Sequence, residues 1–323
     1  MNPLKILYVT NMYPWEKNPY YGIFVSEQIQ GLQEFCHIQP EIIFINGRKW
    51  TLNYLFSIFK INWHLLTNRY DIIHIHYGLS SLFTLFNPFI RTPMVLTLHS
   101  GDIDPKKQKY VQIFISKLAV RKMGAVIILN QEMESTLRPI TDKLITIPCG
   151  VDTGVFQPVD SLGKTEENSR LVVFPANRNR TAKNYPLFEE VIEILRTKYR
   201  FNITTSEVKD MTREQVSRLF CAADCVLMTS FSEGSPQVIK EAMSCNAPVV
   251  STVVGDVDHL LEGVANCYLA PSGTAEELAL KVKTVLENST RTNGRDKIFA
   301  LGLDKESTSI KVNSLYQKLI RKS

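Results

Sequence analysis

Short apolar runs alternate with amphipathic stretches along this chain, and the alternation stops once and then starts again. In the first half, runs of aliphatic and β-branched residues bounded by turn residues fall at 4–9, 41–45, 72–75, 94–98, 125–129 and 144–147. Such runs are typical of buried strands. Strands that alternate with helices predict a parallel, doubly wound α/β sheet, whose ligands lie outside the carboxyl ends of the strands.

The alternation lapses between Pro148 and Ser169, where Pro, Gly, Asp, Ser and Glu recur without periodicity. It resumes with expected strands at 171–175, 201–204, 225–228, 249–251 and 267–269. A chain of 323 residues fits two cores of about 150 residues each. We therefore expect two Rossmann-like domains, over residues 1–153 and 154–306, that face each other across a cleft.

Composition excludes several classes of protein. Hydrophobic residues make up 44% and charged residues 21% of the chain, as in ordinary globular proteins. A net charge of +5 is too mild for a dedicated nucleic-acid binder. The six cysteines form no metal-binding pattern and read as reduced thiols. Because no apolar run reaches the ~20 residues of a membrane span, we expect a cytoplasmic protein.

Residues 230–241, Ser-Phe-Ser-Glu-Gly-Ser-Pro-Gln-Val-Ile-Lys-Glu, follow an expected strand and begin a helix. Ser235 suits the N-cap and Pro236 the first helical position, so unbonded backbone N–H groups should form an anion site. Glu241 would lie about 7.5 Å along the helix from Pro236, close to the span between a diphosphate and its ribose. We expect donor contacts from Glu233, Gly234, Ser235, Pro236, Gln237, Val238 and Glu241. The alternative is a surface helix with ordinary charges.

The two glutamates of this segment, with Glu-Gly-Ser-Pro in front and Glu-Ala-Met behind, resemble the nucleotide-sugar signature of retaining glycosyltransferases of family four, glycosyl transferases group 1, which have the GT-B fold. Similar landmarks of that family occur at 21–28, 71–76, 97–102, 147–156 and 248–255. The resemblance implies that Gly22 lies in a donor-side loop. It also implies that a C-terminal helix, over residues 307–323, packs back on the first domain.

Basic residues follow the first strand of the second domain. The resemblance implies that Arg178 and Lys183 hold the donor diphosphate, with Arg180 as a rival for the arginine role. Two cations and a helix N-terminus can offset the charge on a departing diphosphate without a metal. A solvated basic loop is the alternative. On this basis Glu233, His99, Arg178 and Lys183 are the candidate catalytic residues.

Histidines and acids follow strands of the first domain. The resemblance makes His99 a contact to the transferred sugar, with Asp102, His76 and Asn130 on the acceptor side. His74 and His76 point to one face of their strand, and we expect hydrogen-bonded core or cleft histidines. The Asp-x-Asp triplets at 102–104 and 256–258 could hold a divalent metal, but the two cations make that role redundant, and we expect no metal.

Aromatic residues and cations interleave at 48–69 and again at 106–122. Such stretches suit either a helix lying on an anionic membrane surface or a core-packed helix with a basic solvent face. Both lie in the domain that takes the acceptor in the resembling family. A lipid-linked acceptor, and attachment to the inner face of the membrane, are therefore natural hypotheses.

The resemblance implies a metal-independent enzyme that moves a hexose-type sugar, with retention, from a UDP- or GDP-type nucleotide sugar to a hydroxyl of a lipid-linked, polysaccharide or other glycan precursor. No other cofactor is expected. Because no Gly-rich loop is visible between Lys183 and Glu233, the choice of nucleotide stays open. One alternative is a catalytically silent nucleotide-sugar-binding partner. A second, a dinucleotide-binding oxidoreductase, is disfavoured because the first loop lacks Gly-x-Gly-x-x-Gly.

Overall fold

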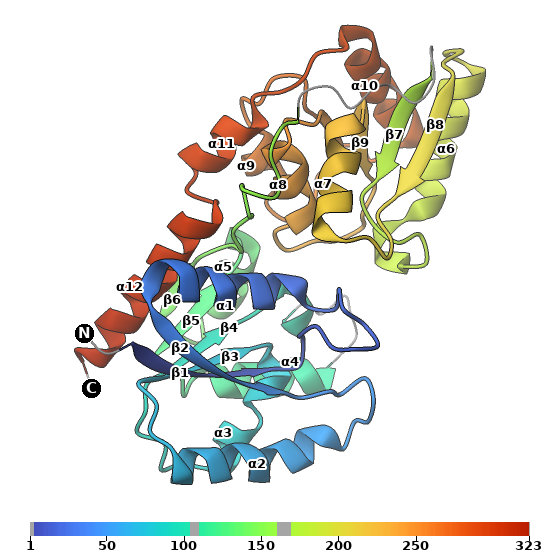
Figure 1. Cartoon of the computed structure of the whole chain (residues 1–323). Coiled ribbons are helices and arrows are strands. Elements are labelled where there is room, and N and C mark those ends of the chain that lie inside the picture. Colours follow the sequence, from blue (N-terminus) through green and yellow to red (C-terminus); the bar gives the residue numbers. More distant parts are fainter. Residues whose placement is uncertain (1–2, 104–109, 160–168, 323) are drawn as a thin grey trace. The chain divides into compact units, whose positions relative to one another are not determined.

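A computed structural model describes residues 3–103, 110–159 and 169–322 of the chain. The chain divides into two compact units (Figure 1). Unit 1 comprises Met1–Gly150 and Lys305–Ser323, and unit 2 comprises Val151–Asp304. We expected domain boundaries after residues 153 and 306. The observed boundaries fall after residues 150 and 304, which is three and two residues earlier in the chain.

Unit 1 is built on a six-stranded sheet in which every neighbouring pair of strands is parallel. The strands are β1 (Leu4–Thr10), β2 (Ile38–Phe44), β3 (Ile72–His76), β4 (Met94–Thr97), β5 (Ala125–Ile128) and β6 (Leu144–Thr146), in the order β2-β1-β3-β4-β5-β6. Strand β2 begins before the expected residue 41 and contains Pro40, which an edge strand tolerates. The predicted parallel, doubly wound architecture is confirmed.

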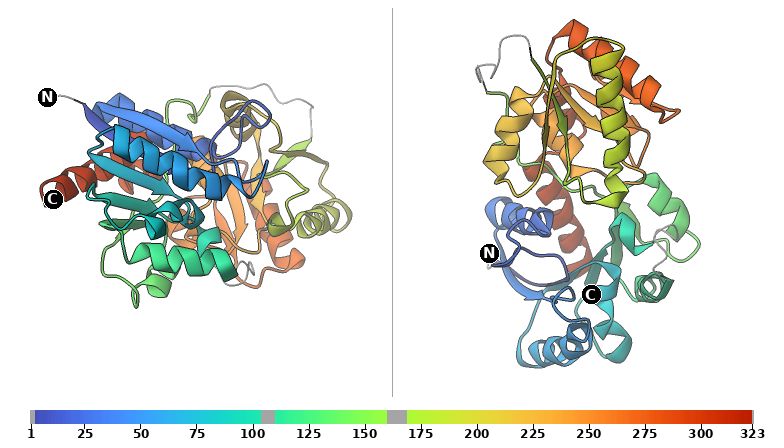
Figure 2. Two further views of the ribbon diagram at one scale, coloured as in Figure 1. Left: turned by 90° about the horizontal axis from the view of Figure 1, so that it is seen from below. Right: turned by 90° about the vertical axis from the view of Figure 1, so that its right-hand side faces the viewer.

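Helices cover both faces of this sheet (Figures 1 and 2). Helices α1 (Ile23–Cys36) and α12 (Lys305–Ile320) pack on one face, in a core that contains Val25, Leu32 and Val312. The other face carries α2 (Asn53–Thr67), α3 (Phe83–Phe86), α4 (Tyr110–Val120) and α5 (Gln131–Leu137). Helix α12 lies against α1, where a Cβ on Gly31 would meet Ser309 Oγ at 2.6 Å.

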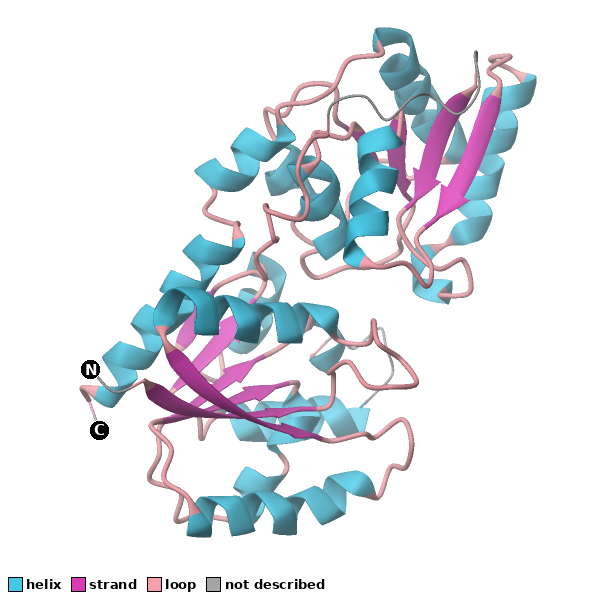
Figure 3. Cartoon of the chain, viewed as in Figure 1, coloured by secondary structure: helices cyan, strands magenta, loops and turns pink. Residues whose placement is uncertain are grey.

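Unit 2 repeats the plan with five parallel strands, drawn in magenta in Figure 3. They are β7 (Arg170–Phe174), β8 (Ile203–Glu207), β9 (Cys225–Met228), β10 (Val249–Thr252) and β11 (Tyr268–Ala270), in the order β11-β10-β9-β7-β8. Helices α6 (Tyr185–Thr197) and α10 (Ala275–Asn288) pack on one face. Helices α7 (Arg213–Ala222), α8 (Gln237–Ser244), α9 (Val257–Leu261) and α11 (Gly294–Ala300) pack on the other.

The strand order creates one place in each sheet where neighbouring loops part. In unit 2, β7 and β9 are adjacent, but β7 leads to α6 on one face and β9 leads to α8 on the other. In unit 1, β1 and β3 are adjacent and lead to α1 and α3 in the same way. Such switch points are where open α/β sheets bind ligands.

Among the described residues, no helix is both long enough and apolar enough to cross a bilayer.

Candidate functional site

The loops that follow β7 and β9 are tied together by hydrogen bonds. The backbone N–H of Phe231 donates to the carbonyl of Ala182 at 3.0 Å. The hydroxyl of Thr229 donates to the carbonyls of Lys183 and Asn184, at 3.1 and 3.0 Å. The expected basic loop therefore lies directly against the segment that carries Glu233.

Lys183 and Glu233 form a buried ion pair at this junction. Lys183 ends a 3₁₀ turn (Thr181–Lys183), and its ammonium donates to Glu233 Oε1. The same oxygen accepts from the hydroxyl of Ser230 at 2.7 Å. The two charged side chains are only 9% and 14% exposed, so the loss of either one would leave the other charge poorly compensated. Both residues were expected at one site, but neither their bond nor a role for Ser230 was expected from the sequence.

The end of β10 and the loop after it pack against the segment that carries Glu233. Thr252 Oγ1 donates to the carbonyl of Ser230 at 2.9 Å. Gly255 has a φ of +61°, and a Cβ built on it would lie 2.4 Å from the carbonyl oxygen of Gly234. Only glycine permits that approach, so Gly255 fixes the position of the Glu233–Gly234 turn.

Helix α8 begins one residue later than expected. Its first residue is Gln237, and Pro236 occupies the N-cap position with an extended ψ of 113°. The N-cap residue is thus Pro236, which makes no side-chain cap bond, so the expectation of Ser235 at the N-cap is wrong. The first N–H groups of α8 nevertheless follow the Glu233 turn directly, as the anion site requires.

Glu241 is buried, although we expected an accessible carboxylate at this position. Its side chain is 2% exposed and pairs with Arg213 Nη2 at 2.5 Å. The guanidinium of Arg213 also lies over the ring of Phe156, 4.6 Å from its centroid. The expectation of an open carboxylate on α8 is therefore wrong for this structure, because α7 supplies a cation that the sequence pattern did not indicate. A ribose contact at Glu241 stays a prediction and requires this pair to open.

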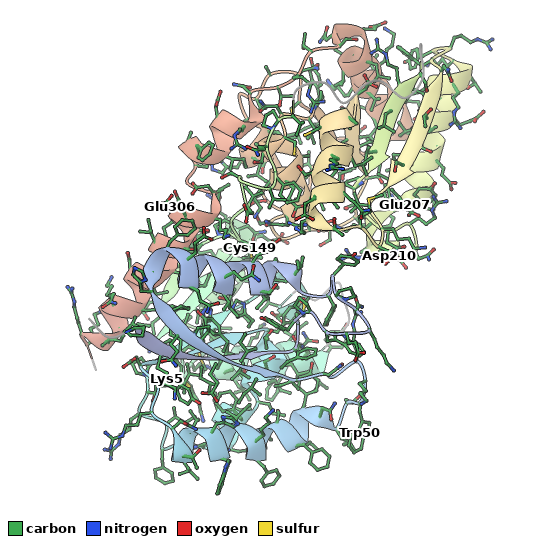
Figure 4. All side chains as sticks on the ribbon, viewed as in Figure 1. Lys5, Trp50, Cys149, Glu207, Asp210 and Glu306 are labelled. Atoms are coloured by element: carbon green, nitrogen blue, oxygen red, sulfur yellow. The ribbon has the colours of Figure 1, made fainter. Side chains whose placement is uncertain are left out.

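Arg178 lies on the surface and turns to β8. Its backbone N–H and Nε donate to Glu207 at 2.8 and 3.0 Å, and its guanidinium lies 4.9 Å from the ring centroid of Tyr185. Burial acts to raise the pKa of the Glu207 carboxyl, but the hydrogen bonds from Arg178 outweigh it and lower that pKa. Figure 4 labels Glu207 in unit 2. The rival Arg180 is exposed and forms no ion pair with a described residue.

In unit 1, Asp102 holds the turn that carries His99. Its Oδ2 accepts from the backbone N–H of His99 at 2.8 Å, and its Oδ1 accepts from Gln112 Nε2 at 3.0 Å. The ring of His99 stacks on Tyr77, with centroids 4.9 Å apart. Burial lowers the pKa of His99 to about 3, so the imidazole is neutral near pH 7 and suits hydroxyl groups rather than anions.

The other two histidines differ from each other. Both ring nitrogens of His74 are bonded, to Tyr316 Oη at 2.5 Å and to Thr97 Oγ1 at 2.7 Å. His76 stacks on His74 at 4.4 Å, but neither of its ring nitrogens has a hydrogen-bond partner among the described residues. Burial first, and then the neighbouring imidazoles, lower the pKa of His76. The expectation of hydrogen-bonded histidines therefore holds for His74 and not for His76.

Asn130 and Gly22 have local structural tasks. Asn130 Oδ1 accepts from the backbone N–H of Met133 at 2.9 Å and so caps α5. Gly22 precedes α1, and a Cβ there would meet the backbone of Met12 at 2.4 Å. Neither contact tests the acceptor role expected for Asn130 or the donor role expected for Gly22.

Within residues 3–103, 110–159 and 169–322, no group of three His, Cys, Asp and Glu side chains is arranged to hold a metal ion. Asp104, from one of the two Asp-x-Asp triplets, lies outside the described residues, as do Lys106, Lys107 and Lys109. All six cysteines are free thiols, as expected.

Family models match both units of the chain. Residues 22–155 match the family described as Glycosyltransferase Family 4, and residues 168–288 match Glycosyl transferases group 1. The chain belongs to the family-four glycosyltransferases. The second match spans β9, α8 and the Lys183–Glu233 pair of this glycosyltransferase.

Solved structures of low sequence identity share the fold. The sucrose-phosphate synthase of Thermosynechococcus elongatus has a TM-score of 0.80 and 18% identity, over 99% of this chain and all of the other. HepE of Anabaena, solved in complex with UDP, has a TM-score of 0.71 and 18% identity, over 98% of this glycosyltransferase and all of HepE. The structural neighbours are GT-B glycosyltransferases.

Curated relatives are distant. A protein of Bacillus subtilis described as a candidate teichuronic acid biosynthesis glycosyltransferase, TuaC, is 23% identical over 85% of this chain and 87% of its own. A D-inositol 3-phosphate glycosyltransferase of Paenarthrobacter aurescens is 27% identical over 64% of this chain and 61% of its own. These relatives are other glycosyltransferases, and they do not specify the substrates of this one.

Proposed function

We propose that this glycosyltransferase transfers a hexose-type sugar from a nucleotide diphosphate sugar to a hydroxyl acceptor, with retention of configuration. The buried Lys183–Glu233 pair is the observation that carries the proposal, because it joins the two loops of the unit 2 switch point directly in front of α8. A cation, a carboxylate and the positively polarised N-terminus of a helix together suit a sugar diphosphate.

In the proposed donor complex, Lys183 and the N-terminus of α8 bind the diphosphate, and Glu233 contacts the sugar. Arg178 or the exposed Arg180 supplies a second cation. Because these groups offset the charge of the leaving diphosphate, we propose that the transfer needs no metal. The structural neighbour HepE was solved with UDP and with UDP-glucose, which supports UDP sugars as the first donors to test, with GDP sugars beside them.

The proposed reaction is a displacement on one face of the sugar. The bond from the anomeric carbon to the diphosphate oxygen breaks, and a bond to the acceptor oxygen forms on the same face. The acceptor's proton passes to the departing phosphate oxygen. His99, held by Asp102, is proposed to hydrogen-bond a hydroxyl of the transferred sugar as a neutral imidazole.

We also propose a lipid-linked or other glycan precursor as the acceptor, and a cytoplasmic enzyme that attaches to the inner face of the membrane. The description of the Bacillus relative, which concerns teichuronic acid biosynthesis, supports a glycan precursor. The exposed apolar side chains of α2 support the proposal that the enzyme attaches to a membrane.

Thermal unfolding with a panel of nucleotides and nucleotide sugars, with and without EDTA, tests donor binding. We expect one nucleotide class to raise the unfolding temperature equally in both conditions. Lys183→Ala should abolish that rise, whereas Lys198→Ala, an exposed lysine of the same unit, should not. Donor binding without transfer to any acceptor in a glycolipid panel would favour the silent partner instead.

A further inference from the structure

Helix α2 exposes an apolar face. Its residues Leu55, Phe56, Phe59, Trp63 and Leu66 are between 50% and 82% exposed, and we name these five the α2 face. At about 100° per residue, the five positions fall within an arc of about 100°. Figure 4 shows the side chains of α2, with Trp50 labelled near one end of the helix.

The opposite side of α2 packs on the sheet. Ser57 and Ile61 are buried there, and Tyr54, Ile58 and Leu65 pack against the core of unit 1. The core is therefore completed without the α2 face. This finding corrects one of the two expectations for residues 48–69, because the solvent face of the packed helix is aromatic and aliphatic rather than basic.

The apolar surface continues beyond α2. Asn87 Nδ2, just after α3, donates to Asn62 Oδ1 of α2 at 2.6 Å. The neighbouring Phe86 and Phe89 are 64% and 86% exposed. Single exposed apolar residues are common on protein surfaces, but a group of this size marks an interaction surface.

Exposed cations lie on α2 and in the segments next to it, and acids are few there, although Glu41 pairs with His64 of α2 at 2.7 Å. Lys60 on α2 and Arg69 after it are exposed, as are Arg48, Lys49 and Arg91. Between residues 42 and 101 the sequence contains one acid, Asp71. An apolar face with a positive rim matches the acyl boundary and head groups of an anionic bilayer, whereas a protein partner would not require this charge bias.

We propose that the α2 face, with Phe86 and Phe89, lies on an anionic lipid surface. The aromatic and aliphatic side chains insert between lipid head groups, and Lys60, Arg69 and Arg91 contact lipid phosphates. The surface goes beyond the transfer reaction and deepens the proposed lipid-linked acceptor. Vesicle binding tests it without any measurement of sugar transfer, so the two proposals can fail separately.

The experiment is flotation of the full chain with vesicles of phosphatidylcholine and phosphatidylglycerol in equal parts, at low salt. We expect binding that is lost with phosphatidylcholine alone and weakened by salt. Phe59→Glu with Trp63→Glu should lower the partition coefficient about tenfold or more, because both apolar area and charge attraction are reduced. Binding should shift the tryptophan emission of the chain to shorter wavelength, and Trp63→Phe should remove much of that shift.

The matched control is Leu280→Glu with Phe299→Glu, which places the same two charges on exposed apolar sites of unit 2. It should bind anionic vesicles nearly as the parent does. Unchanged unfolding temperatures show that both variants fold, since the four replaced side chains are about half or more exposed. Equal losses in the two variants, or no binding by the parent chain, would overturn the proposal. If the parent chain is a dimer and Phe59→Glu with Trp63→Glu dissociates it, the α2 face is an interface between two copies of the chain and the proposal is overturned.

Discussion

Gly255→Ala tests whether the loop after β10 positions Glu233, the carboxylate that we propose contacts the donor sugar. The new Cβ would lie 2.4 Å from Gly234 O, and real Cβ contacts stay above 3.0 Å. The Glu233–Gly234 turn and the Gly255 loop must therefore separate by at least 3.0 minus 2.4, or 0.6 Å, and we expect the turn to take part of this shift. A shift of that size next to reacting groups lowers kcat/KM by about 10- to 100-fold.

The same substitution also strains the backbone, and Gly263→Ala isolates that contribution. Gly263 has a φ of +73°, but a Cβ on it would meet nothing within 4 Å. Left-handed backbone costs a non-glycine residue about 1–2 kcal/mol. In a unit of this size, that cost lowers the unfolding temperature by about 2–8 °C. Gly255→Ala should lose about 1–3 kcal/mol more, because its neighbours must be displaced.

The assay is donor titration by calorimetry, followed by transfer kinetics, well below the unfolding temperature of both variants. We expect Gly263→Ala to bind and transfer as the parent does. Gly255→Ala should stay folded and lose transfer. Parent-like kinetics in Gly255→Ala would refute the argument that this close approach positions Glu233.

Three further changes probe the ion pairs and the histidines. Glu233→Gln frees Lys183 from its carboxylate, so calorimetry should show nucleotide diphosphate binding at least as tight as in the parent, with much slower transfer; weaker binding would contradict the assigned contact. Arg213→Ala leaves Glu241 buried without its cation, and denaturant unfolding should show a loss of about 3–5 kcal/mol; an unchanged midpoint would show that the pair is not needed. Burial lowers the pKa of His99 to about 3, so the unfolded state binds more protons and stability falls as pH drops below the unfolded pKa, by about 1 kcal/mol per such histidine between pH 7 and 5.5. His99→Asn should flatten this dependence, and an unchanged slope would place the titrating group elsewhere.

Most strands could be predicted because they are buried apolar runs, and β9 (Cys225–Met228) has the bounds that we expected. Strand β8 (Ile203–Glu207) was expected at 201–204, and its bounds were missed because its two threonines are exposed and it ends in polar residues. The seven-residue α11 was missed. Its buried Ile298 packs against other helices of unit 2, and seven residues carry too little periodicity to reveal that contact. The local sequence pattern predicts a helix or strand when the element has a regular apolar face of its own. The pattern fails when the element is buried mainly by contacts with elements that are distant in the sequence.

The candidate site divides in the same way. Lys183 and Glu233 could be assigned to one site because each follows a strand of the same sheet. The pair between Arg213 and Glu241 joins α7 to α8 across 28 positions, so it depends on how two helices pack. Nothing near either residue in the sequence indicates the other. The sequence therefore predicted which residues gather, but not which of them neutralise one another.

The strand order explains why a charged pair is stable where the loops part. Because β7 and β9 send their chains to opposite faces, their loops diverge at the carboxyl ends of these two strands, and polar groups there take partners from the loops themselves. Lys183 comes from one loop and Glu233 from the other, so their ion pair joins the two loops at the switch point. In the proposed donor complex, a diphosphate would compete with Glu233 for the N–H donors of the Lys183 ammonium. We therefore expect donor binding to weaken the bond between Lys183 and Glu233 and to leave the carboxylate better able to contact the sugar.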